Sequence, residues 1–160
     1  MRILGLDPGS RITGIAVIED SSLLFAESLR LGSGPLPGRL GRVLERVSEV
    51  VTEFAPQAAA VEAVFMSRNA RSALVLGQAR GAAVAGLVAS GLQVHEYSPR
   101  EVKQAIVGRG SADKQQIQHM VRVLLGVRSP LEEDAADALA VALCHRSHAE
   151  TARRMPQGAR

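Results

Sequence analysis

Short apolar runs separated by turn residues mark the first part of the chain. Residues 2–7, 12–19 and about 22–31 have the length and composition of β-strands. Between the first two runs, the segment 7–10 (Asp-Pro-Gly-Ser) is a turn signal with proline at its first central position. Successive strands joined by tight turns predict a three-stranded antiparallel meander.

The pattern then changes to helices that alternate with strands. A segment rich in Gly and Pro over 32–37 reads as a loop, and apolar residues recur at helical spacing over 40–54. The short apolar run over 58–62 ends in an acid and predicts a buried strand. Asn69 is a suitable N-cap for a helix of small residues over about 70–89.

The same alternation continues to the C-terminal region. Residues 92–97 read as a strand, and a serine-proline pair then opens a short helix over about 98–107. Ser111 is expected to cap the next amphipathic helix. A second serine-proline pair predicts a last helix over about 129–146.

Together these elements predict an α/β fold: a mixed five-stranded sheet, antiparallel in its first three strands, with helices on both faces. The 160 residues fit one domain, expected over 1–148, and the 46% of hydrophobic residues suffice for a sizeable core. The polar segment 149–160 is expected to be a disordered tail. In such a sheet the ends of the first and fourth strands lie side by side, so Asp7 and Glu62 would meet at one edge.

Composition narrows the class of protein. With the single cysteine Cys144 no internal disulfide can form, and no apolar run approaches the ~20 residues of a membrane span. We therefore expect a cytoplasmic protein without a membrane partner. The net charge of +3 and the pI near 9.7 are compatible with nucleic acid without requiring it. Of the 19 basic residues only Lys103 and Lys114 are lysines, whose compact charge a guanidinium does not replace.

Four carboxylates stand where charge is costly. Asp7 and Glu62 end buried-looking strands, and Asp134 and Asp137 lie three apart in an apolar helical segment, on one helix face. Like charges in one low-dielectric site raise each other's pKa, and a divalent cation removes that cost. Asp134 and Asp137 by themselves are also typical of acids near a helix N-terminus, where the helix dipole favours negative charge.

An all-carboxylate ligand set favours magnesium or manganese over zinc. The neighbouring Cys144, His145 and His148 superficially resemble a soft-metal site, but we expect them at the surface near a frayed helix end. Two hard cations about 4 Å apart form the clamp used in phosphoryl transfer, which predicts a phosphodiester substrate.

Five blocks of the sequence resemble the RuvC-type Holliday-junction resolvases. The blocks cover residues 3–14, 61–69, 76–81, 102–110 and 134–139, in this order, and the similarity extends over about 1–146. The resemblance implies an RNase H-like fold and a homodimeric endonuclease that depends on Mg²⁺ or Mn²⁺, with two ions per active site. Such an enzyme resolves four-way DNA junctions in recombination and repair by two symmetric nicks.

The resemblance also implies roles for individual residues. The catalytic, metal-binding acids fall on Asp7, Glu62, Asp134 and Asp137. Lys103 would contact the scissile region, as a catalytic and DNA-binding residue, and Lys114 would bind a nearby phosphate.

Further residues would contact DNA or a second subunit. Phe65 would stack on an unpaired base, and Arg68 and Arg71 would hold phosphates. The helix that carries Ala73, Gly77 and Gly81 would line a two-fold dimer interface. Branch-migration helicase machinery is a further expected partner.

Three other functions share parts of this pattern. An actin-like or sugar-kinase-like ATPase has a similar opening turn but needs a second lobe to enclose its nucleotide. An RNase H-like nuclease acting on another nucleic acid would share the fold and the metals; the blocks around Phe65 and Lys103 argue against it. A non-catalytic junction-binding protein would tolerate loss of an acid, and none is lost.

Overall fold

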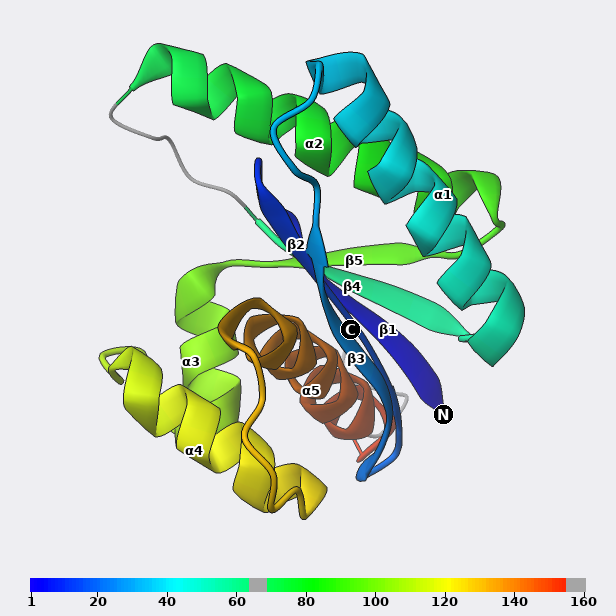
Figure 1. Ribbon diagram of the computed structural model, residues 1–160. Helices are drawn as coiled ribbons and strands as arrows, with labels where there is room; N and C mark the ends of the chain where they lie inside the picture. The colour runs from blue at the N-terminus through cyan, green and yellow to red at the C-terminus, as the bar shows by residue number, and fades with distance from the viewer. Residues whose placement is uncertain (64–68, 155–160) are drawn as a thin grey trace, which may run out of the picture.

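A five-stranded sheet forms the centre of the computed structural model, which describes residues 1–63 and 69–154 (Figure 1). Its order is β3-β2-β1-β4-β5. The strands are β1 (Arg2–Asp7), β2 (Ile12–Glu19), β3 (Ser22–Arg30), β4 (Ala58–Glu62) and β5 (Val94–Tyr97). β1, β2 and β3 pair antiparallel, whereas β4 runs parallel to β1 and to β5. The predicted mixed sheet is confirmed.

Helices cover both faces of this sheet, as predicted (Figure 1). The helices are α1 (Leu36–Phe54), α2 (Ala70–Ala89), α3 (Pro99–Val107), α4 (Lys114–Leu125) and α5 (Glu133–Arg154). α1 and α2 pack together on one face, while α5 lies against the other with α3 and α4 beside it. Successive residues of a strand point to opposite faces, so Ile3 joins the core under α5 and Leu4 the core under α1 and α2.

The central helix α5 lies very close to the sheet. Its N-terminal half is buried on nearly all sides, from Ala135 to His145 with few exceptions. A Cβ placed on Gly5 of β1 would meet the Ala138 carbonyl oxygen at 2.0 Å, so only glycine fits there. The approach of helix to sheet therefore depends on the missing side chain of a strand residue.

Three predicted helix starts are wrong by a few residues. α1 begins at Leu36, inside the expected loop, because proline is compatible with the first helical turn. α4 is capped by Asp113 and not by Ser111: the Asp113 side chain accepts from the Gln116 amide, and the Gln116 side chain accepts from the Asp113 amide. α5 begins only at Glu133, after the serine-proline pair.

The expected disordered tail is also partly wrong. α5 continues to Arg154, so residues 149–154 are helical, and 155–160 lie outside the described residues. Cys144 and His145 are buried rather than at the surface, because this part of α5 still packs against the sheet and α3, whereas His148 is exposed as predicted. The Tyr97 hydroxyl lies 2.7 Å from His145 Nδ1 and satisfies this buried ring.

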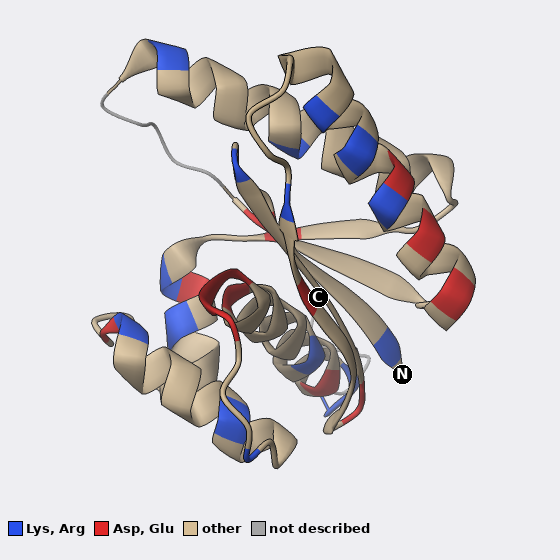
Figure 2. Cartoon of the chain, viewed as in Figure 1, with Lys and Arg blue, Asp and Glu red and all other residues tan. Residues whose placement is uncertain are grey.

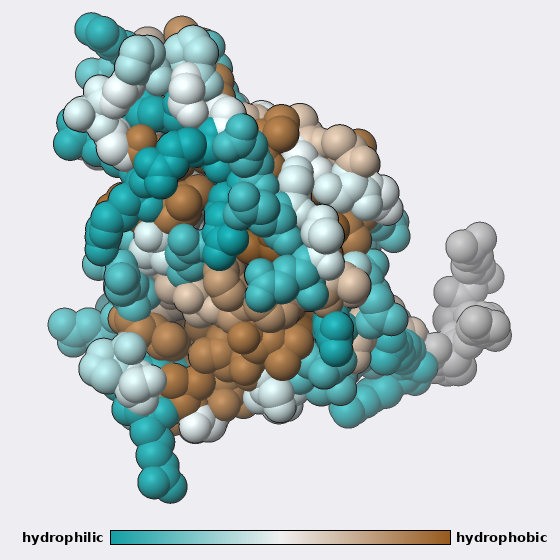
Figure 3. All heavy atoms as spheres, turned by 45° about the vertical axis from the view of Figure 1, so that its right-hand side comes forward, coloured by the Kyte–Doolittle hydropathy of each residue, from teal (hydrophilic) through white to brown (hydrophobic). Residues whose placement is uncertain are grey.

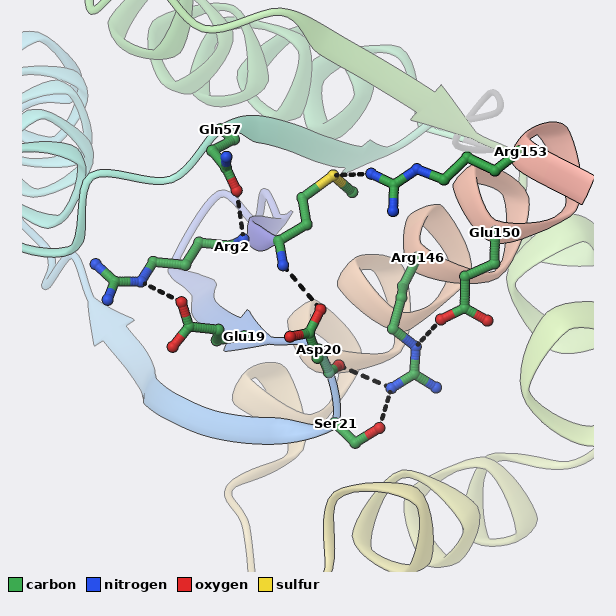
Figure 4. A network of polar contacts seen from close by, with 9 residues as sticks. Arg2, Glu19, Asp20, Ser21, Gln57, Arg146, Glu150 and Arg153 are labelled. Carbon is green, nitrogen blue, oxygen red and sulfur yellow. Dashed lines mark hydrogen bonds and ion pairs between the residues drawn. The ribbon is translucent and has the colours of Figure 1, made fainter.

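Polar contacts fasten the edge of the sheet where β1 begins (Figure 4). The Met1 ammonium contacts Asp20 in the β2–β3 turn at 2.7 Å. Arg146 of α5 donates to the Asp20 carbonyl at 2.8 Å and to the Ser21 hydroxyl at 3.0 Å. Exposed contacts of this kind are weak, because water and salt screen them. Together they join β1, the β2–β3 turn and α5.

The outward face of α2 is apolar and has no partner within the described chain. Leu74 and Val88 are 65% and 58% exposed, and Gly77, Gly81 and Ala85 lie on the same stripe between them. By length and composition alone α2 could cross a membrane, and only 22% of its most apolar stretch is buried inside the protein. On the face drawn in Figure 3, hydrophilic side chains gather above and hydrophobic ones in the lower middle. Apolar surface is thus exposed in several places.

Candidate active site

The parallel pairing of β1 and β4 places two acids next to each other. Leu6 pairs with Val61, so Asp7 and Glu62 are the following residues of adjacent strands at the carboxyl edge of the sheet. This confirms their predicted juxtaposition. Both side chains are partly buried, because strand ends covered by helices have little access to water.

The first turns of α5 bring the other two acids to the same edge. A Cβ on Gly14, which pairs with Asp7 across β1 and β2, would meet the Asp134 carbonyl oxygen at 2.0 Å. α5 can therefore begin directly over the end of the sheet. Figure 2 shows the acidic start of α5 beside basic residues of α3 and α4.

The pKa values show that the acids act on one another. Burial raises the pKa of Asp7 to about 7, with further contributions from Glu62, Asp137 and Asp134. Burial and then the charge of Asp137 raise the pKa of Glu62. Burial raises the pKa of Asp137 as well, against the lowering effect of Lys114. The four acids form one electrostatic cluster that favours bound protons or added positive charge.

Both lysines lie at this cluster. Lys103 of α3 and Lys114 of α4 line a pocket of about 260 Å³ together with Glu62 and Asp137. The Lys114 ammonium contacts Asp137 at 3.0 Å and also contacts Glu133. Burial lowers the pKa of Lys114, but hydrogen bonds to Glu133 and Asp137 outweigh burial and raise it. Lys114 is therefore a fixed positive charge beside the acids.

The donor chemistry of the cluster fits a hard cation. Four carboxylates lie at one sheet edge, and carboxylate oxygens are ligands of the type that Mg²⁺ and Mn²⁺ prefer. Burial, as the largest cause, raises the pKa of three of them, Asp7, Glu62 and Asp137. Among residues 1–63 and 69–154, however, no three His, Cys, Asp or Glu side chains already lie close enough to hold a metal ion. Small side-chain movements, including release of Asp137 by Lys114, would be needed to form a complete ligand set.

The remaining predicted residues lie on or before α2. Phe65 and Arg68 fall outside the described residues. Arg71 is exposed in the first turn of α2, where Asn69 caps the helix as predicted. Gly77 and Gly81 are exposed on the outward stripe, and Ala73 is half-buried at its margin. Within residues 1–63 and 69–154, no hydrogen bond or ion pair joins Arg71, Ala73, Gly77 or Gly81 to the acids.

Sequence reasoning missed three residues that shape the site. Glu133 pairs with Lys114, and Gly14 allows the backbone of α5 to approach β2. Arg39 of α1 donates to the Ser10 carbonyl at 3.0 Å and so holds the turn after Asp7. Glu133 stands in an acidic run, and nothing local distinguishes it from its neighbours. The glycine lay inside a recognised block, but its role depends on a helix 120 residues further along.

Pocket size does not identify the site. A larger pocket, about 710 Å³, lies between α3 and the C-terminal half of α5 and is lined in part by Arg100, Glu101 and His148. It contains none of the four acids. The chemistry at the edge of the sheet therefore gives the better candidate.

Comparison with known proteins shows the family of this chain. A family model described as crossover junction endodeoxyribonuclease RuvC matches residues 3–145. The crossover junction endodeoxyribonuclease RuvC of Methylococcus capsulatus is 54% identical over 157 residues, which cover 96% of this chain and 95% of that protein. The solved structure of Thermus thermophilus RuvC in complex with a Holliday junction substrate is 37% identical, with a TM-score of 0.89 and coverage of 95% and 96%. The yeast mitochondrial resolvase Ydc2, 12% identical with a TM-score of 0.64 and coverage of 94% and 82%, shares the fold.

Proposed function

Because the chain belongs to the RuvC family of crossover junction endodeoxyribonucleases, we propose that it resolves four-way DNA junctions by two symmetric phosphodiester nicks. The enzyme is a hydrolase that acts on DNA and serves recombination and repair. The observation that carries this conclusion is the acid cluster of Asp7, Glu62 and Asp137, beside two lysines that share a pocket with Glu62 and Asp137. The chain that holds this cluster is related to these nucleases over nearly its full length.

Nucleases of this family depend on metal ions. Asp7, Glu62, Asp134 and Asp137 are the residues that would hold them. Two Mg²⁺ ions, with Mn²⁺ as a substitute, would offset the charge of the acids and stabilise the negative charge that develops on the cleaved phosphodiester. The raised pKa values of Asp7, Glu62 and Asp137 support this assignment, since crowded carboxylates of this kind gain most from added positive charge.

The two lysines bring basic side chains to the proposed site of cleavage. Lys103 lines the same pocket as Glu62 and is assigned to the scissile region. Lys114 lies further towards the solvent, where it is 53% exposed and within reach of a phosphate. An ammonium next to an anionic phosphate gains from electrostatic attraction and from release of counterions. Lys103 acts on the reacting group and Lys114 on the adjacent backbone.

Residues near the start of α2 extend the DNA contact. Arg71, exposed at the first turn of α2, is assigned to phosphate binding. Phe65 and Arg68, which lie outside the described residues, are assigned to base stacking and to phosphate binding from their place in the second block. Arg80 is less suited, because its guanidinium already pairs with Glu96 at 2.8 Å.

A homodimer would place two such sites for paired incision. The apolar stripe of α2 that includes Gly77 and Gly81, with Ala73 at its margin, is the proposed two-fold interface. A Cβ at either glycine would meet nothing within 4 Å, so the surface there is open to a second copy. Branch-migration helicase machinery is proposed as a further partner from family resemblance alone, and the cytoplasm as the place of action.

Cleavage of matched substrates tests the proposal. Purified protein with Mg²⁺ or Mn²⁺ should nick two strands of a synthetic four-way junction at symmetric positions. It should leave a linear duplex and an RNA–DNA hybrid largely intact. Equal cutting of all three substrates would instead favour the alternative, an RNase H-like nuclease with another nucleic-acid substrate. Absence of cutting with either metal would contradict both functions.

A further inference from the structure

Lys114 has two carboxylate partners in the structure, and they differ in kind. Asp137 belongs to the acid cluster and is the less exposed partner, at 26%. Glu133 lies one helical turn earlier on α5 and is 63% exposed. The lysine thus bridges the edge of the cluster and its solvent side.

We propose that Glu133 is a positioning residue that holds Lys114 over the acid cluster in the DNA-free protein and competes with DNA phosphate for this lysine. The proposal rests on the junction-binding function given above and goes beyond it. Its physical basis is exchange: an ammonium that already contacts two carboxylates must give up a partner before it can contact a phosphate. Glu133 is the partner nearer to solvent, so it is the one that an incoming phosphate replaces.

Local structure fixes both members of this pair. Lys114 is the first residue of α4, directly after the Asp113 capping box that sets the start of this helix. Glu133 is the first residue of α5, where a carboxylate is favoured by the helix dipole. The two helix starts hold the charges together, and neither side chain needs to cross the core to make the contact. Only a local movement of the Lys114 side chain is required to release it.

The chain offers a matched control next to Glu133. Glu132 is also an exposed acid, 60% against 63%, but its partner is Arg30 of β3 at 2.7 Å. Removal of either acid reduces general repulsion of DNA by one charge. Only removal of Glu133 also frees Lys114.

Junction affinity without divalent metal is the appropriate measurement, because it does not depend on catalysis. Fluorescence anisotropy with a synthetic four-way junction in EDTA should show that Glu133→Gln binds two- to fivefold more tightly than the wild-type protein. Glu132→Gln should gain less. In a Lys114→Ala background the gain from Glu133→Gln should fall to that of Glu132→Gln, whereas the gain from Glu132→Gln should stay the same.

Salt dependence gives a second readout, which reports the phosphate contact that the proposal requires of Lys114. In the Glu133→Gln background, Lys114→Ala should flatten the slope of log affinity against log salt by about 0.7 to 0.9, the value of one phosphate contact. Equal effects of Glu133→Gln with and without Lys114, or no effect, would overturn the proposal, provided that circular dichroism shows folded variants. Failure of the wild-type protein to prefer a junction over a duplex would instead contradict the proposed function.

Discussion

Gly14 on β2 and Asp134 on α5 are in backbone contact: a Cβ on Gly14 would lie 2.0 Å from the Asp134 carbonyl oxygen and 2.6 Å from its carbonyl carbon. Gly14 also pairs with Asp7 across β1 and β2. A single position without a side chain therefore sets how near the helical acids come to the strand acids. This close approach of backbone to backbone has direct consequences for stability and activity.

Gly14→Ala should move α5 away from the carboxyl edge of the sheet. Backbone atoms cannot give way as a flexible side chain can, so the cost should be about 3 kcal/mol or more. Urea unfolding measures this loss, and cleavage should fall with it. Gly41→Ala is the control: nothing lies within 4 Å of a Cβ there, and alanine in helix α1 should gain up to about 1 kcal/mol. Equal stability of the two variants would show that α5 does not depend on Gly14.

Asp7→Asn should abolish cleavage while junction binding survives, because it removes charge and keeps shape. Burial holds the pKa of Asp7 at about 7, so from pH 4 to 7 the folded protein keeps a proton that the unfolded chain releases. The free energy of unfolding of the metal-free protein should therefore decline as pH rises through this window. Asp7→Asn should remove this part of the decline and stabilise the metal-free protein at pH 8 by on the order of 2 kcal/mol. Loss of binding together with cleavage would mean that the acid has a structural role.

His145 should make the protein sensitive to acid. Burial, and then the charges of His95 and His148, lower its pKa to about 4. Between pH 6.5 and 4 the unfolded chain binds a proton that the folded protein does not, so the free energy of unfolding should fall as pH falls. Urea unfolding at pH 7, 5.5 and 4.5 should show a shallower loss for His145→Gln. The exposed His119 on α4 provides the control, and His119→Gln should keep the wild-type slope.

Gly81→Arg should separate the proposed dimer without unfolding the subunit. The position is exposed and a side chain there meets nothing within 4 Å, so the isolated chain should accept arginine in α2. Sedimentation at micromolar concentration should show a dimer for the wild-type protein and a monomer for the variant, with loss of paired nicks. Gly41→Arg, in open space on α1, should stay dimeric. A wild-type monomer would contradict paired incision by two copies.

Local patterns predicted most of the secondary structure and the positions of the acids. β1, β2 and β4 match their expected ranges, and β3 nearly so, because apolar runs with turn residues are local signals. The cap of α4 at Asp113 was missed, since capping depends on side-chain geometry that several nearby residues could supply, and the start of α5 at Glu133 was placed a few residues too early. The end of α5 was missed because the helix continues to Arg154 as a mostly exposed segment that looks polar from its sequence.

Residue type, place in an element and family resemblance were enough to propose the residues of the site, namely Asp7, Glu62, Asp134, Asp137 and the two lysines. How these residues come together depends on tertiary packing. The contact of Gly14 with α5, the bridge from Lys114 to Glu133 and Asp137, and the burial of His145 against Tyr97 join residues far apart in the chain. Such contacts have no period along the sequence, because they depend on which faces of the sheet and helices pack together.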